Sequence, residues 1–192
     1  MMDERSLTTL PPDLPVPQDD GAAAHLAGTR LPHVPLRATD GSTVDLASLP
    51  GTVVVFAYPR TGRPGEPSLV DDWDMIPGAR GCTPHTCGFR DLDADFRALG
   101  ARVFGLSTQD TAYQREMVER MHVPFPVLSD EKLELANALR LPTMVVAGQT
   151  LIKRMALIID EGRITHVFYP VFPPDRNAGD VLDWLKRNRK ES

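Results

Sequence analysis

The chain has 192 residues, of which 42% are hydrophobic and 24% charged, and its formal net charge at pH 7 is -5. This length fits one domain with additional segments, and this composition is typical of a soluble globular protein. The negative charge leaves no basic face for nucleic acid, and the longest apolar runs, residues 53–57 and 155–159, fall far short of the roughly 20 residues of a membrane helix. We therefore expect neither nucleic acid nor a membrane as a partner.

Residues 1–30 are rich in proline, alanine and aspartate and show no apolar periodicity. Such a composition is typical of a poorly ordered arm, so we expect the folded domain to span residues 31–192. The segment also lacks the basic start and apolar stretch of a secretory signal, which predicts a cytoplasmic protein. In that compartment two neighbouring cysteines are more often catalytic or metal-binding than a structural disulfide.

The next part of the chain predicts a hairpin and then a buried strand. Asp40 and Gly41 lie between two extended runs within residues 36–46, which is typical of a hairpin turn. Residues 52–58 are apolar without interruption, which favours a strand that is covered on both faces. A long irregular segment with several prolines and glycines follows over residues 59–80. Loops of this length are usually functional or mobile.

Both cysteines of the chain, Cys82 and Cys87, follow this long segment. Helical periodicity begins at Thr83 and continues to Leu99, and Gly100 is a typical residue after a helix end. The first turn of a helix favours the thiolate form of a cysteine, and the thiolate attacks peroxides, disulfides and metals. The pattern therefore predicts a thiol redox protein.

The second half of the chain alternates between strands and helices. We expect strands at residues 102–107, 126–128, 155–159 and 164–168 and helices at residues 111–122, 130–140 and 178–189. A short turn around Gly162 joins the last two strands into a hairpin. This order predicts an α/β fold in which helices flank a central mixed β-sheet.

Five local motifs occur in a fixed order between about residue 31 and residue 190. They are Phe56-Ala57-Tyr58-Pro59, Gly81-Cys82-Thr83 with Cys87-Gly88-Phe89-Arg90-Asp91, Gly105-Leu106-Ser107-Thr108, Phe125-Pro126-Val127-Leu128-Ser129-Asp130, and Arg154 with the hairpin of residues 158–164. In this order they resemble the thioredoxin-like fold. Within that fold they are similar to peroxiredoxins of the AhpC/TSA superfamily, specifically the peroxiredoxin Q or bacterioferritin comigratory protein group.

This resemblance implies an antioxidant thiol peroxidase that reduces hydrogen peroxide and organic hydroperoxides without an organic or metal cofactor. Cys82 would be the peroxidatic cysteine that becomes a sulfenic acid, and Cys87 the resolving cysteine that joins it in an intramolecular disulfide. Arg154 would approach the thiolate and hydrogen-bond the peroxide oxygens. Thioredoxin or a similar dithiol would be the reductant, and the protein would act as a monomer or homodimer.

Helix geometry adds a condition to this disulfide. Residues five apart in an α-helix have Cα atoms about 8 to 9 Å apart. A disulfide needs a Cα separation of roughly 4.4 to 6.8 Å. We therefore expect residues 82–88 to unwind whenever Cys82 and Cys87 become joined.

The sequence departs from the family pattern at two positions. Ala79 stands where the family has a threonine or serine whose hydroxyl binds the thiolate and the peroxide. Either the long loop folds outward so that Thr61, together with Pro59, reaches the pocket, or a water or Thr83 supplies that hydroxyl. His85 stands where the group often has a glutamate, and it either packs on the helix or assists proton transfer.

Other roles remain open at this point. Trp73, in the long acidic loop, would close the pocket, form a dimer contact or pack in a surface flap. Cys82, His85 and Cys87 together offer soft or borderline ligands to a metal, and the same residues suit a non-catalytic redox-binding protein of this fold. A disulfide exchanger would normally have Cys-x2-Cys, and a structural zinc site usually needs four ligands, so the spacing argues against both.

Overall fold

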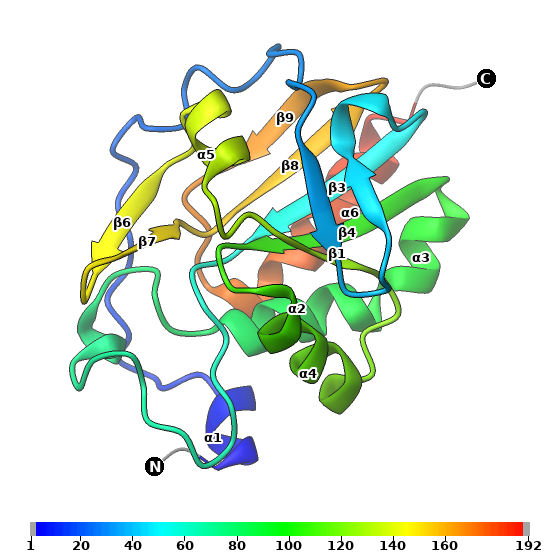
Figure 1. Cartoon of the computed structure of the whole chain (residues 1–192). Coiled ribbons are helices and arrows are strands. Elements are labelled where there is room, and N and C mark those ends of the chain that lie inside the picture. Colours follow the sequence, from blue (N-terminus) through cyan, green and yellow to red (C-terminus); the bar gives the residue numbers. More distant parts are fainter. Residues whose placement is uncertain (1–2, 190–192) are drawn as a thin grey trace.

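A seven-stranded sheet forms the centre of the molecule, and the computed structural model describes residues 3–189 of the chain (Figure 1). Its strands are β1 (Pro35–Ala38), β2 (Thr43–Asp45), β3 (Thr52–Ala57), β4 (Ala101–Ser107), β5 (Val127–Ser129), β8 (Met155–Asp160) and β9 (Arg163–Phe168). They lie in the order β2-β1-β5-β4-β3-β8-β9. The β3–β4 and β4–β5 pairs are parallel and the other pairs are antiparallel, so the predicted mixed sheet is confirmed.

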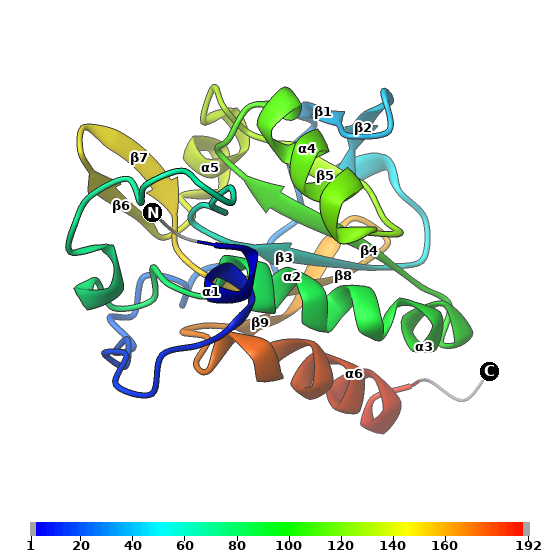
Figure 2. The same cartoon turned by 90° about the horizontal axis from the view of Figure 1, so that it is seen from below.

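Helices cover both faces of this sheet. The α-helices are α1 (Glu4–Thr8), α2 (Cys82–Asp91), α3 (Asp93–Ala98), α4 (Thr111–Met121), α5 (Glu134–Leu139) and α6 (Asn177–Arg187). Helices α2, α4 and α6 pack on one face, where α2 and α6 lie side by side (Figure 2), and α5 packs on the other. Within residues 3–189, none of the helices has the length and apolar character needed to cross a membrane.

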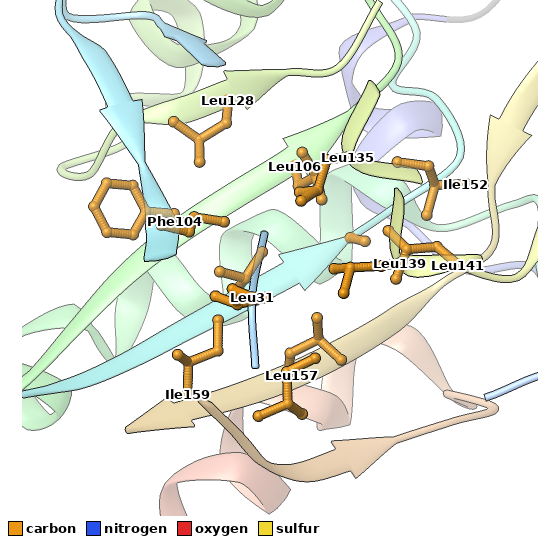
Figure 3. Close-up of a cluster of buried hydrophobic side chains, with 14 of the residues drawn as sticks. Leu31, Phe104, Leu106, Leu128, Leu135, Leu139, Leu141, Ile152, Leu157 and Ile159 are labelled. Atoms are coloured by element: carbon orange, nitrogen blue, oxygen red, sulfur yellow. The ribbon is translucent and has the colours of Figure 1, made fainter. Parts of the chain in front are cut away.

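Strand β3 shows why the central apolar run lacks alternation. Val53 and Val55 face the cluster that contains α5, whereas Val54 and Phe56 face the cluster that contains α2. All four side chains are fully buried. Figure 3 shows the first of these clusters, where leucines of β4, β5 and α5 meet. Because both faces of β3 are packed, the loop that follows it starts from a rigid part of the core.

Two predicted helices differ from those observed. The helix predicted over residues 83–99 is divided at Leu92 into α2 and α3. The helix predicted from residue 130 begins only at Glu134. The Asp130 carboxylate accepts hydrogen bonds from the backbone N–H groups of Leu135 and Ala136 at 3.1 and 2.8 Å, so Asp130 lies in a turn that caps the helix from outside.

One hairpin was not predicted. Strands β6 (Thr143–Val146) and β7 (Gln149–Ile152) pair antiparallel in a separate two-stranded sheet. Their turn places Ala147 and Gly148 at positive φ angles of 49° and 74°. This conformation suits a tight hairpin, but alanine rarely adopts it, so residue type did not point to the turn.

Residues 3–30, for which we expected a poorly ordered arm, contact the domain at several points. Residues 4–8 form α1, and the Leu26 side chain is fully buried in the cluster with α5. Gly28 N–H donates to the carbonyl of Ile164 at 2.7 Å, and Leu31 N–H donates to that of Gly162 at 2.8 Å. The apolar residues of this segment stand singly among prolines and acids, and each packs at a different place on the domain. Because they are isolated along the chain, the sequence shows no apolar periodicity that would predict these contacts.

Candidate active site

Cys82 is the first residue of α2 and is only 3% exposed. The preceding residue, Gly81, is the N-cap with φ 106°, a left-handed conformation that favours glycine. A Cβ on Gly81 would collide with Pro174 and lie 2.9 Å from Cδ2 of Leu10, so a side chain does not fit there. The sulfur therefore sits at the positive end of the helix, in a position that the backbone of Gly81 defines.

Two N–H donors point at the Cys82 sulfur. The backbone N–H of Arg60 lies 3.4 Å from Sγ, and Nη2 of Arg154 lies 3.2 Å from it. The thiol itself is 3.5 Å from the carbonyl oxygen of Ala79, to which it donates. Donors of this kind stabilise negative charge on sulfur and on oxygen atoms bound to it.

Arg154 is a buried cation that has no acidic partner among residues 3–189. Its side chain is 3% exposed. Nη2 donates to the carbonyls of Gly78, Ala79 and Arg80 at 3.1 to 3.3 Å, and none of the ion pairs formed among residues 3–189 includes Arg154. A buried charge is costly unless an opposite charge lies beside it. The Cys82 sulfur is the reactive group that Arg154 contacts.

His85 contacts the guanidinium nitrogen of Arg154 that does not contact Cys82. Its Nδ1 lies 3.0 Å from Nη1 of Arg154, and its Nε2 lies 2.8 Å from Oδ1 of Asn177. Burial and the Arg154 cation hold the pKa of His85 well below its usual range. The imidazole is therefore neutral near pH 7, with Nδ1 accepting from Arg154 and Nε2–H donating to Asn177.

This arrangement distinguishes between the roles considered for His85. The ring is fully buried and makes edge contacts with Phe56 and Phe89 at centroid distances of 5.1 and 5.5 Å. Both ring nitrogens are engaged, so neither is free to carry a proton to a leaving group or to bind a metal. The geometry favours a packing role that also orients Arg154.

Replacing His85 by phenylalanine is expected to slow the oxidation of the Cys82 thiol by added hydrogen peroxide about tenfold, because Arg154 loses the acceptor that orients it beside the sulfur. The rate constant is measured by mixing the reduced variant with peroxide in stopped flow. The matched control is His166→Phe, since His166 lies on β9, where it stacks on Trp184 with centroids 4.7 Å apart. Equal effects of the two exchanges would contradict the role of His85.

Thr61 lies in the same cavity as Cys82, as one of the two alternatives for the missing hydroxyl requires. It is 1% exposed, and its N–H and hydroxyl both donate to Oε1 of Gln109 at 3.1 Å. Gln109 Nε2 returns a bond to the Thr61 carbonyl at 3.0 Å. This pair of residues holds the loop that aims the Arg60 N–H at Cys82. The Thr61 oxygen keeps its capacity to accept a hydrogen bond.

Pro59, Thr83 and Ala79, the other residues considered around the missing hydroxyl, lie at different distances from the cavity. Pro59 is buried, and it precedes the amide that contacts Cys82 without lining the cavity itself. Thr83 lines the cavity as well, so the second alternative for the hydroxyl also has a side chain in place. At Ala79 the backbone carbonyl, rather than a side chain, contacts both Cys82 and Arg154.

Cys87 lies further along α2 and is partly exposed. Burial raises the pKa of its thiol, so Cys87 remains protonated near neutral pH while α2 is intact. Both cysteines are free, and α2 is continuous from Cys82 to Asp91. The structure therefore holds the helical state from which the predicted unwinding must start.

Sequence reasoning missed three parts of the site. These are the backbone N–H of Arg60, the Gln109 side chain and the Asn177 side chain. Asn177 lies 92 residues from the histidine it binds, and Gln109 lies 48 residues from Thr61. A lone amide side chain carries no signal in the sequence for such a distant partner.

Comparison with known proteins identifies the family of the chain. A family model described as Redoxin matches residues 26–182. Peroxiredoxin Q, chloroplastic, of Oryza sativa subsp. japonica is 30% identical over 161 residues, which cover 83% of this chain and 66% of that protein. Peroxiredoxin Bcp of Escherichia coli (strain K12) is 29% identical over 167 residues, covering 84% of this chain and 96% of that protein. The chain thus spans just under two thirds of the length of the rice protein.

Solved structures show the same architecture. The crystal structure of peroxidoxin BcpB from Mycobacterium tuberculosis has a TM-score of 0.69 and 26% sequence identity, and the match covers 86% of this chain and all of that chain. A mutant of PrxQ from Xylella fastidiosa also has a TM-score of 0.69, with 21% identity and 86% of this chain covered. These likenesses confirm the predicted thioredoxin-like fold class.

Proposed function

The chain belongs to the Redoxin family, and from that premise we propose that it is a thiol peroxidase that reduces hydroperoxides at Cys82. The observation that carries the proposal is the contact of the Cys82 sulfur with Arg154 Nη2 and Arg60 N–H at the start of α2. The similarity of the chain to peroxiredoxin Q and peroxiredoxin Bcp supports the same activity.

The first step is an attack of the Cys82 thiolate on the terminal oxygen of a hydroperoxide. An S–O bond forms as the O–O bond breaks, and the leaving oxygen takes up a proton to give an alcohol or water. Negative charge builds up on the peroxide oxygens during this step. Arg154 and the Arg60 N–H lie beside the sulfur and can stabilise that charge without reorganisation. The product on the protein is a sulfenic acid.

The second step joins the two cysteines. The Cys87 thiolate attacks the Cys82 sulfur, an S–S bond forms, and the sulfenic oxygen leaves as water. This step requires residues 82–88 to leave the helical conformation, and exposure of Cys87 then removes the burial that raises its pKa. Gly88 lowers the stability of this part of α2, since glycine costs about 1 kcal/mol relative to alanine in a helix, and Pro84 lies in the first turn, where its missing N–H costs no helical hydrogen bond. Thioredoxin or a similar dithiol then restores both thiols by exchange.

The test is a titration of the reduced protein with stoichiometric hydrogen peroxide, followed by mass spectrometry. We expect the wild type to lose the two thiol hydrogens and to yield a peptide in which Cys82 and Cys87 are joined. The Cys87→Ser variant should gain a single oxygen and stop there, because no second thiol is present in the chain. A wild-type protein that reacts no faster than free cysteine would overturn the proposed function. A Cys87→Ser variant that still forms a disulfide within one chain would overturn the role of Cys87.

A further inference from the structure

The N-terminal segment lies before the part of the chain that matches the family model, residues 26–182, yet it lines the cavity that holds Cys82. Leu7 of α1 faces this cavity and is 6% exposed. Figure 2 shows α1 beside the first turns of α2, and contacts between the two helices agree with this view. A segment outside the family match therefore forms part of the surroundings of the reactive sulfur.

Specific contacts hold the segment in this place. Nη2 of Arg80 donates to the backbone carbonyls of Ser6 and Thr9, and Nη1 of Arg80 pairs with Asp74 at 3.1 Å. Arg80 is only 9% exposed, so these bonds are largely shielded from water. Leu10 packs against Gly81, directly before Cys82. The long loop of residues 59–80 and the N-terminal segment are thus connected to each other beside the active site.

The cavity beside Cys82 opens to solvent. Apolar side chains from three parts of the chain line it, namely Leu7 of α1, Leu69 and Trp73 of the long loop, and Tyr113 of α4. Polar and charged side chains line it as well, namely Arg60, Thr61, Glu66, Ser68, Arg80 and Thr83. A wall that combines apolar side chains with polar ones can contact both the apolar body and the polar group of one ligand.

We propose that Leu7 is a specificity-determining residue, and that α1 and the loop of residues 59–80 together select organic hydroperoxides with an apolar body. This inference rests on the proposed peroxidase function. The hydroperoxide group points to Cys82, and the organic group lies against Leu7, Leu69 and Trp73. The long loop and Trp73 thus act as a wall of the substrate pocket.

The test compares rate constants for hydrogen peroxide and cumene hydroperoxide in three variants, each from single-turnover oxidation of the reduced full chain. Leu7→Trp places a larger ring in the cavity and is expected to lower the rate constant for cumene hydroperoxide about tenfold or more, with that for hydrogen peroxide within about twofold. Leu7→Ala leaves the cavity open but removes apolar contact, so cumene hydroperoxide should again be affected more than hydrogen peroxide. Val16→Trp is the matched control, because Val16 lies in the same segment, is 58% exposed and does not line this cavity.

The ratio of the two rate constants decides the proposal. A ratio that falls in both Leu7 variants and stays constant in Val16→Trp supports the selecting role of Leu7. Parallel changes for both peroxides, or an unchanged ratio, would show that Leu7 only stabilises the domain and would overturn the inference while the peroxidase function stands. Wild-type protein that reacts with neither peroxide would instead overturn the proposed function itself.

Discussion

Exchanging Cys82 for serine is expected to abolish hydroperoxide reduction while the domain stays folded. A serine hydroxyl remains neutral at neutral pH, so it does not supply the anionic nucleophile that breaks the O–O bond. The exchange conserves the side-chain size, and the hydroxyl oxygen can still accept from the Arg60 and Arg154 donors that now contact sulfur. The rate constant should fall by about 10⁴-fold or more, the order observed when an enzyme loses its nucleophile. The measurement is peroxide consumption by the reduced protein with excess dithiol.

The control for this experiment is the other cysteine. Cys87→Ser should keep the first oxidation at the wild-type rate, because its thiol takes part only in the second step. Substantial peroxide consumption by Cys82→Ser would identify Cys87 as the nucleophile and reverse the two roles. Circular dichroism of both variants separates a loss of chemistry from a loss of fold.

Replacing Arg154 by methionine is expected to lower the rate constant with hydrogen peroxide by about 10²- to 10³-fold, the loss typical of removing one donor to the charge that develops in the transition state. Methionine fills similar volume but donates no hydrogen bond to sulfur or peroxide. The effect on stability should be small, for two opposing reasons. The carbonyls of Gly78, Ala79 and Arg80 lose a donor, which costs about 1 to 3 kcal/mol. Removing a buried cation that has no acidic partner offsets that cost.

The neighbouring residue provides the matched control for Arg154. Lys153 pairs with Asp20 at 3.0 Å on the surface, so Lys153→Met removes a cation one position away from the site. We expect this variant to react with peroxide at the wild-type rate. A decrease of less than about threefold in Arg154→Met, under 1 kcal/mol in activation free energy, would show that Arg154 is not part of the reacting site. Chemical denaturation of both variants gives the accompanying change in stability.

The local parts of this protein follow from its sequence. Uninterrupted apolar runs predicted the central strands β3 and β8, and Asp40-Gly41 predicted the first hairpin. The position of Cys82 at the start of a helix was equally predictable. Each of these features depends on side-chain periodicity, turn chemistry or helix ends, which act over a few residues. The resemblance to peroxiredoxins rests on motifs of the same short range.

Only the tertiary structure decided which distant groups meet at Cys82. Arg154 contacts the Cys82 sulfur although the two residues are 72 positions apart in the sequence. Asn177 binds His85 although these two are 92 positions apart. The N-terminal segment was expected to be unpacked, because its apolar residues are isolated along the chain, yet Leu7 lines the cavity. Contacts between segments depend on how the sheet and helices pack, and a single arginine, asparagine or leucine carries no local pattern that identifies its partner. The sequence alone therefore determined the class of fold and indicated Cys82 as the candidate nucleophile, whereas packing decided how the groups around Cys82 are assembled.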